Sequence, residues 1–75
     1  PVFTTEEGIQ QIKKNLDKIL DWQDIIELIP KYYLKDKMQK TGMAGIFAAS
    51  LELVKERVIH ISQEKDLNKL MIKKI

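Results

Sequence analysis

The 75-residue sequence contains no cysteine and only one histidine, His60. The absence of cysteine excludes a disulfide scaffold and a thiolate zinc site, and one imidazole is too few for a structural zinc site. His60 falls in the middle of an expected strand, and no catalytic triad can be assembled around it. The three glycines are isolated and form none of the loops that hold phosphate groups. We therefore expect a protein that is not an enzyme and that uses no metal ion and no cofactor.

Long apolar runs and an excess of one charge are also missing. No segment approaches the roughly 20 apolar residues of a membrane span, and the N-terminus lacks the layout of a signal peptide. The 13 basic and 11 acidic residues give a net charge of only +2, so no strong field attracts a polyanion. The lysines between residues 31 and 40 are interpreted as a solvated connection, with contact to nucleic acid as the alternative. These absences predict a soluble protein without a membrane partner, and the lack of cysteine is compatible with the expected cytoplasmic location.

The apolar content that remains is sufficient for a folded domain. Hydrophobic residues make up 44% and charged residues 32% of the chain, a balance typical of globular proteins. A chain of this length forms one domain with a small core. Because the sequence starts at Pro1 without a Met and enters a folded-looking segment at once, we expect residues 1–75 to be one domain of a longer chain.

Two helices are expected in the first part of the chain. Thr4 and Thr5, followed by Glu6 and Glu7, are typical of a helix N-terminus, since they offer a hydroxyl acceptor and acidic side chains. The first helix is predicted over residues 5–20, because apolar residues recur there at helical spacing. A second helix is predicted over residues 21–29, capped by an aspartate and ended or kinked by Pro30.

A third helix is predicted over residues 42–57, and its apolar arc is wider than one buried face requires. One sector of this helix, with Phe47, Leu51 and Val54, is expected to face the interior. The full set of predicted core residues is Ile12, Leu16, Ile25, Leu28, Phe47, Leu51 and Val54. The adjoining sector is either buried between the other elements or forms a partner surface. The predicted partner-binding residues are those of this sector, Met43, Ile46, Ala49, Ser50 and Leu53.

The C-terminal part of the chain predicts a β-hairpin. Residues 58–62 and 69–74 alternate in the way strands do, and a polar interval containing Leu67 separates them. Val2, Phe3 and Thr4 are expected to add a short third strand, because an isolated hairpin is only marginally stable. The order strand, three helices, two strands predicts a mainly α fold with a small β-hairpin wing, a winged helix.

The third helix also carries a family resemblance. The segment from Phe47 to Lys55, FAASLELVK, with Val58 and the pair Gln63-Glu64 after it, resembles the C-terminal signature FLALLELVK…V…QE of the bacterial kleisin family ScpA. The resemblance extends over essentially the whole chain. The sequence departs from the family pattern at Ala48 and Ser50, where leucines are usual.

This resemblance implies a C-terminal winged-helix domain of a ScpA-like kleisin that binds the head of an SMC ATPase. Such a protein acts in chromosome condensation and segregation at the nucleoid, and ScpB binds a part of the kleisin outside these residues. DNA contact would be indirect or weak.

Two other functions compete with this interpretation. A DNA-binding winged helix would place its third helix in the major groove. The positions expected to point outward on this helix, Gly45, Ala49, Glu52 and Glu56, are small or acidic and argue against that role. A domain that only assembles with a second copy of itself is the other alternative, because a wide apolar arc could be buried in a twofold contact.

Overall fold

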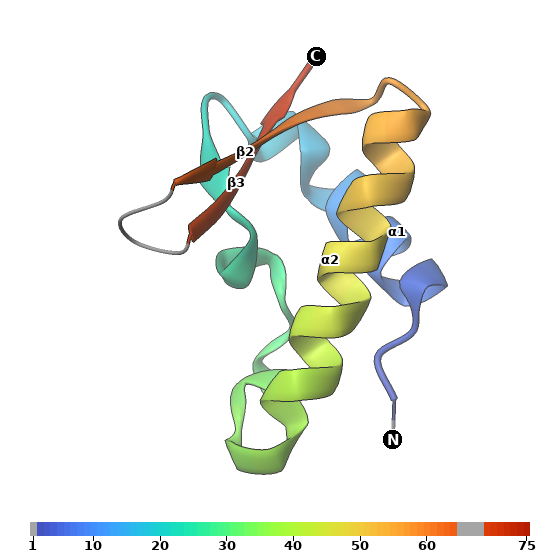
Figure 1. Ribbon diagram of the computed structural model, residues 1–75, viewed down its shortest axis with the longest axis vertical. Helices are drawn as coiled ribbons and strands as arrows, with labels where there is room; N and C mark the ends of the chain where they lie inside the picture. Colours follow the sequence, from blue (N-terminus) through green and yellow to red (C-terminus); the bar gives the residue numbers. More distant parts are fainter. Residues whose placement is uncertain (1, 65–68) are drawn as a thin grey trace.

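The chain forms two α-helices followed by a β-hairpin, with short 3₁₀ turns between the helices (Figure 1). The structure is a computed structural model, and it describes residues 2–64 and 69–75. The helices are α1 (Thr5–Asn15) and α2 (Gln39–Lys55). The strands are β1 (Gln23–Asp24), β2 (Ile59–Glu64) and β3 (Lys69–Lys74). The 3₁₀ turns are η1 (Leu16–Lys18), η2 (Ile25–Leu28), η3 (Lys31–Leu34) and η4 (Asp36–Met38).

Helix α1 begins where the sequence predicts. The Thr4 hydroxyl accepts a hydrogen bond from the Glu7 amide at 3.1 Å, and the Glu7 carboxylate accepts one from the Thr4 amide at 3.1 Å. This capping box satisfies two amides that the helix leaves without partners. The α-helix ends at Asn15 rather than Leu20, because the Leu16 amide bonds to the Lys13 carbonyl and the chain continues as the 3₁₀ turn η1. The Asn15 side chain donates to the Gln11 carbonyl at 2.8 Å.

The second predicted helix is not present, and residues 21–29 form a strand and a turn instead. Gln23 and Asp24 pair with β3, which gives their backbone groups partners outside a helix. The Asp24 carboxylate then accepts a hydrogen bond from the Ile26 amide at 3.0 Å and caps the single turn η2. A segment this short gains little from helix formation, because nucleation is costly and Pro30 stops propagation.

The sheet has the strand order β1-β3-β2, and all its strands are antiparallel. Its third strand is β1 and not residues 2–4 as predicted. Phe3 is instead buried at 4% exposure, and its amide donates to the Thr41 hydroxyl at 2.9 Å. Strand β2 begins at Ile59, one residue later than predicted, and runs to Glu64, two residues further than predicted. Strand β3 has its predicted bounds. The predicted turn residue Leu67 lies outside the described residues.

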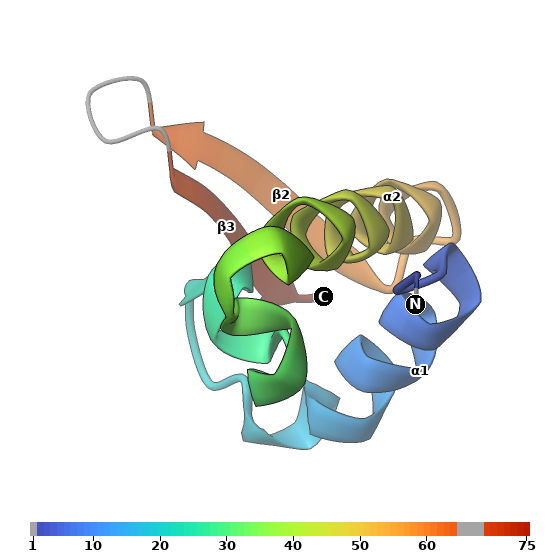
Figure 2. The same cartoon turned by 90° about the horizontal axis from the view of Figure 1, so that it is seen from below.

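The mainly α winged-helix fold is nevertheless confirmed. The two α-helices pack against each other, and the hairpin extends away from α1 on the other side of α2 (Figure 2). The core lies between α1, α2 and the inner face of the sheet. Its least exposed apolar side chains, at 1% or less, are Ile12, Ile25, Ile46, Ala49, Leu53, Ile59 and Ile72.

The predicted core is correct for α1 and η2 but wrong for two residues of α2. Ile12, Ile25 and Leu28 are buried, and Leu16 and Val54 pack against the core while partly exposed. Phe47 and Leu51 are 45% and 48% exposed, so their assignment to the core is corrected.

The physical reason for this error is the close approach of α1. A Cβ added to Gly8 would lie only 2.7 Å from the Ala49 Cβ and from the Gly45 carbonyl oxygen. The small side of α2 therefore faces α1 at short range, and the aromatic side is turned outward. Ser50 is tolerated at this buried face because its hydroxyl donates to the Ile46 carbonyl at 2.8 Å.

Candidate protein-binding surface

Four of the five predicted partner-binding residues lie inside the domain. Ile46, Ala49, Ser50 and Leu53 are 0% exposed and contribute to the contact of α2 with the rest of the core. Met43 alone among the five reaches the surface, at 38% exposure. The expectation that this sector forms a free surface of the folded domain is therefore wrong, and the exposed apolar face of α2 lies beside it.

That exposed face carries a stripe of large apolar side chains. Met43, Phe47 and Leu51 are spaced four residues apart, so they lie above one another on one side of the helix. Their exposures of 38%, 45% and 48% are high for residues of this size. We call these three residues the α2 stripe. A helix face turned permanently to solvent normally carries charged residues at such positions.

A hollow of about 330 Å³ separates the α2 stripe from the hairpin, and we call it the wing hollow. Helix α2 forms one wall, the hairpin forms the other, and Ile25 contributes from η2. Its lining residues are Ile25, Met43, Ala44, Phe47, Gln63 and Leu70. None of these six residues carries a charge.

Met43 also borders a second, smaller hollow of about 70 Å³. This hollow is lined by Ile26, Ile29, Tyr33, Leu34, Gln39 and Met43. Ile26 and Leu34 are 45% and 38% exposed, which extends the apolar surface from α2 onto η2 and η3. The two hollows share one side chain and are bordered by uncharged residues, a composition that suits the desolvated centre of a protein–protein contact.

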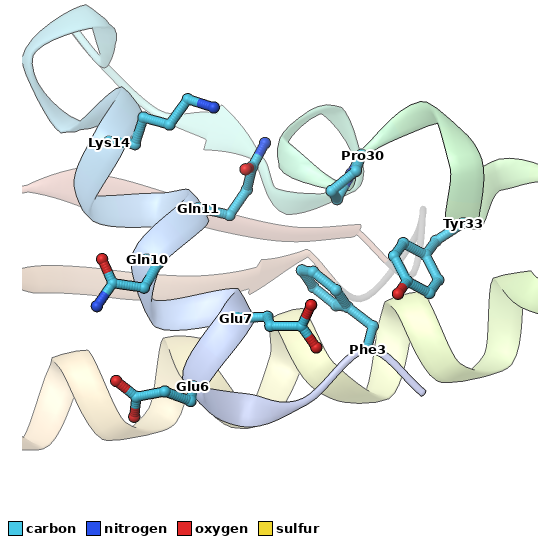
Figure 3. A pocket seen from close by; sticks show the side chains of 8 residues that line it. All are labelled: Phe3, Glu6, Glu7, Gln10, Gln11, Lys14, Pro30 and Tyr33. Atoms are coloured by element: carbon cyan, nitrogen blue, oxygen red, sulfur yellow. The ribbon is translucent and has the colours of Figure 1, made fainter. Parts of the chain in front are cut away.

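A third hollow, of about 580 Å³, lies between α1 and the segment from Pro30 to Tyr33 (Figure 3). Its α1 side is polar and carries Glu6, Glu7, Gln10, Gln11 and Lys14. On the opposite side the Phe3 and Tyr33 rings contact each other, with centroids 4.8 Å apart. We call it the α1 hollow.

Tyr33 is the titratable group of the α1 hollow with a shifted pKa. Desolvation of the phenol raises the pKa of Tyr33 above its ordinary value, and the charges of Glu7 and of Tyr32 raise it further. The neutral hydroxyl is therefore favoured in the folded state. The α1 hollow offers carboxylates, amides and a phenol, but no thiol or imidazole lines it.

The remaining candidate groups stand apart from these hollows. His60 is exposed on β2 and lines none of the three. Within residues 2–64 and 69–75, no group of three His, Cys, Asp or Glu side chains is placed to hold a metal ion. No helix in the described part of the chain is long and apolar enough to cross a bilayer. The lysines of the expected basic cluster, Lys31, Lys35, Lys37 and Lys40, are all exposed.

Sequence reasoning missed the surface residues contributed by η2, η3 and β3. Ile26 lies in the segment predicted as the second helix, which is not present, and Leu34 lies in the segment interpreted as a solvated connection. For Leu70 the alternation of β3 was visible, but the face it would point to was not. A usable signal did exist on α2, because Met43, Phe47 and Leu51 recur at a spacing of four.

Comparison with known proteins identifies one family. Residues 4–75 match the family model described as segregation and condensation protein ScpA. No curated protein and no solved structure matches the chain. The ScpA family acts in chromosome segregation and condensation, and its members are kleisins of SMC complexes, a structural role and not an enzymatic one. Because the match covers nearly the whole sequence, the chain belongs to the ScpA family of segregation and condensation proteins.

Proposed function

We propose that this chain is the C-terminal winged-helix domain of a longer kleisin and that it binds the head of an SMC ATPase. The α2 stripe and the wing hollow form the proposed contact. The observation that carries the proposal is the exposure of Met43, Phe47 and Leu51 on one helix face beside an uncharged hollow. A surface of this kind loses water favourably when a partner covers it.

The size of the side chains supports a protein partner. Phe and Met are enriched at the centres of protein–protein contacts, where charged residues are depleted. Phe47 stands at the middle of the stripe and borders the wing hollow, so it occupies the position of an anchor residue. ScpB, the other expected partner of a ScpA kleisin, is assigned to a part of the protein outside these residues.

The same face argues against major-groove recognition of DNA. Two of the positions predicted to point outward from α2, Gly45 and Ala49, are buried. The exposed positions in the middle of α2 are Met43, Ala44, Phe47 and Leu51, whereas Gln39 and Lys40 are exposed at its first turn and Lys55 at its end. Apolar side chains at the centre of the helix supply neither the amide nor the guanidinium groups that read base edges.

A pull-down with an SMC head fragment tests the proposal. Phe47→Arg and Leu51→Arg should each weaken binding by several kcal/mol, because a charge would enter a desolvated contact. Both side chains are about half exposed, so the circular dichroism spectrum and the unfolding midpoint should change little.

Leu20→Arg is the matched control. Leu20 is 91% exposed and lines none of the three hollows, so the same chemical change there should leave binding intact. Equal binding of the Phe47, Leu51 and Leu20 variants would contradict the proposed surface. Failure of the unchanged chain to bind any SMC head fragment would contradict the proposed function.

A further inference from the structure

The positive charge of this chain is concentrated in one short segment. Residues 31–40 contain four of the 13 basic residues but only one of the 11 acidic residues. This segment therefore carries a charge of +3, whereas the rest of the chain carries −1. We call its four basic residues the lysine patch: Lys31, Lys35, Lys37 and Lys40. The small net charge of the whole chain hides this local excess.

The lysine patch lies on a folded part of the chain. It extends over η3, η4 and the first turn of α2, which pack against one another. The Met38 amide donates to the Lys35 carbonyl at 2.9 Å, and the Gln39 side chain donates to the Leu34 carbonyl at 2.9 Å. These bonds hold η4 against the end of η3. The four lysines are therefore gathered at the end of the molecule opposite the C-terminus (Figure 1).

The lysine patch is exposed, and no acidic side chain of the described residues forms an ion pair with it. The ion pairs of the described residues both belong to β3, where Lys73 lies 3.8 Å from Asp21. Lys74 lies 3.3 Å from Asp17. The first turn of α2 carries no acidic residue, so the positive end of the helix dipole adds to the charge of the patch. A local positive potential of this kind attracts a polyanion.

The form of the lysine patch suits a long polyanion better than a small anion. None of its lysines lines one of the three hollows, so none of these hollows encloses a phosphate group beside the patch. Duplex DNA presents one phosphate charge for about every 1.7 Å of its axis. Lysines contact such phosphates as point charges and do not read the sequence. The amide nitrogen of Gln39, the neighbouring group able to bond to a base edge, is engaged by the Leu34 carbonyl.

We propose that the lysine patch binds the phosphate backbone of duplex DNA, weakly and without sequence preference. The family to which this chain belongs acts in chromosome segregation and condensation, so duplex DNA is the polyanion at its place of action. The lysine patch shares no side chain with the α2 stripe or the wing hollow. Its binding to DNA is therefore independent of the proposed contact with the SMC head.

Two double variants with the same change in net charge test the lysine patch. Lys37→Gln with Lys40→Gln removes two charges of the patch, and Lys13→Gln with Lys18→Gln removes two exposed charges from α1 and η1. Fluorescence anisotropy with a labelled duplex measures binding between about 50 and 200 mM salt. The patch variant should bind about tenfold more weakly at the lowest salt, and its log–log salt slope should be smaller by about 2, because two phosphate contacts are lost. The control variant should stay within about twofold of the unchanged chain.

Asp36 allows a change in the opposite direction. Its φ is 39°, and asparagine shares with aspartate the ability to adopt a positive φ at little cost. Asp36→Asn therefore keeps the local backbone and removes the negative charge between Lys35 and Lys37. This variant should bind the duplex about threefold more tightly at low salt, because a like charge no longer faces the phosphates.

Three results would overturn the proposal, once circular dichroism has shown that every variant is folded. If the unchanged chain binds no duplex even at low salt, the lysine patch is only a solvated surface. Equal losses in the two double variants would mean that the overall charge, and not the patch, determines binding. Tighter binding to vesicles of anionic lipid than to the duplex would assign the patch to a lipid surface. No SMC head fragment is present in these measurements, so none of the three results bears on the proposed function.

Discussion

Gly45 lies directly against the backbone of Phe3, so that a Cβ at position 45 would overlap the Phe3 carbonyl oxygen. The same glycine faces Gly8 across the contact between α1 and α2. The N-terminal segment and the two helices therefore meet at one point where no side chain fits. The backbone angles of Gly45 are those of an ordinary helix residue, with no positive φ, so its small size rather than its flexibility is required.

Gly45→Ala should therefore destabilise the domain, although alanine is the better helix former. Overpacking typically costs about 1–3 kcal/mol, and the expected loss appears as a lower urea midpoint. The exposed neighbour provides the control, because Ala44→Gly changes helix propensity alone and should cost about 1 kcal/mol. A gain in stability for Gly45→Ala would show that α1 and Phe3 can move away from α2 at little cost.

The phase of α2 can be tested by comparing two neighbouring residues. Ile46 is 0% exposed and Phe47 is 45% exposed. Ile46→Ala should lower the free energy of unfolding by about 2–5 kcal/mol, because it leaves a cavity in the core. Phe47→Ala should cost clearly less, despite removing the larger side chain. If Phe47→Ala cost more than Ile46→Ala, Phe47 would be the buried residue, as the sequence predicted.

Tyr33 should make stability depend on pH in the alkaline range. Desolvation, followed by the charges of Glu7 and Tyr32, raises the pKa of Tyr33 above its ordinary value of 10.0. The unfolded chain then ionises first, so the stabilisation from Tyr33 is fully present below the unfolded pKa. It is lost as the pH rises through the folded pKa.

Replacing Tyr33 by Phe should flatten the decline of the free energy of unfolding above about pH 10. Glu7→Gln keeps a residue that can complete the capping box but removes one cause of the raised pKa, so it should reduce the decline. Urea unfolding at a series of alkaline pH values measures both effects. An identical decline in the unchanged chain and in Tyr33→Phe would refute the assignment.

Binding to DNA should be weak and non-specific. We expect dissociation constants no tighter than roughly 10⁻⁴–10⁻⁶ M at physiological salt, measured by fluorescence anisotropy with unrelated duplexes. If the exposed lysines make the contact, replacing Lys35 and Lys37 by Gln should reduce the salt dependence equally for every sequence. Retention of one particular duplex at physiological salt would favour the DNA-binding alternative.

The sequence was sufficient to predict the fold class, the start of α1 and the bounds of β3. These features depend on local signals: the Thr4–Glu7 cap, the alternation of residues 69–74 and the polar interval before them. The second helix could not be predicted correctly, because Gln23 and Asp24 obtain their partners from β3, far along the chain. A local pattern carries no information about such a pairing.

The predicted partner-binding residues lie on the same helix as the candidate surface, but all of them except Met43 lie on the buried side of that helix. Both sides of α2 are apolar, so hydrophobicity alone did not distinguish them. Which side of α2 is buried depends on the small residues Gly8, Gly45 and Ala49, because they let α1 approach one side of the helix closely. Small residues signal close packing as much as they signal an interface, and only the position of α1 separates the two meanings.

The middle position of β3 also sets the order in which the sheet can form. Strands β1 and β2 both pair with β3 and with no other strand of the described chain. Both strands are therefore synthesised before β3, the strand with which they pair. The residues of β1 and their partners in β3 are nearly fifty positions apart in the sequence. The two α-helices lie in the part of the chain before Lys69. The strands in that part, β1 and β2, do not pair with each other, so no sheet can form there without β3. A chain that stops before Lys69 would consequently lack the core residue Ile72 and leave two strands unpaired, with the edge of β2 open on both sides.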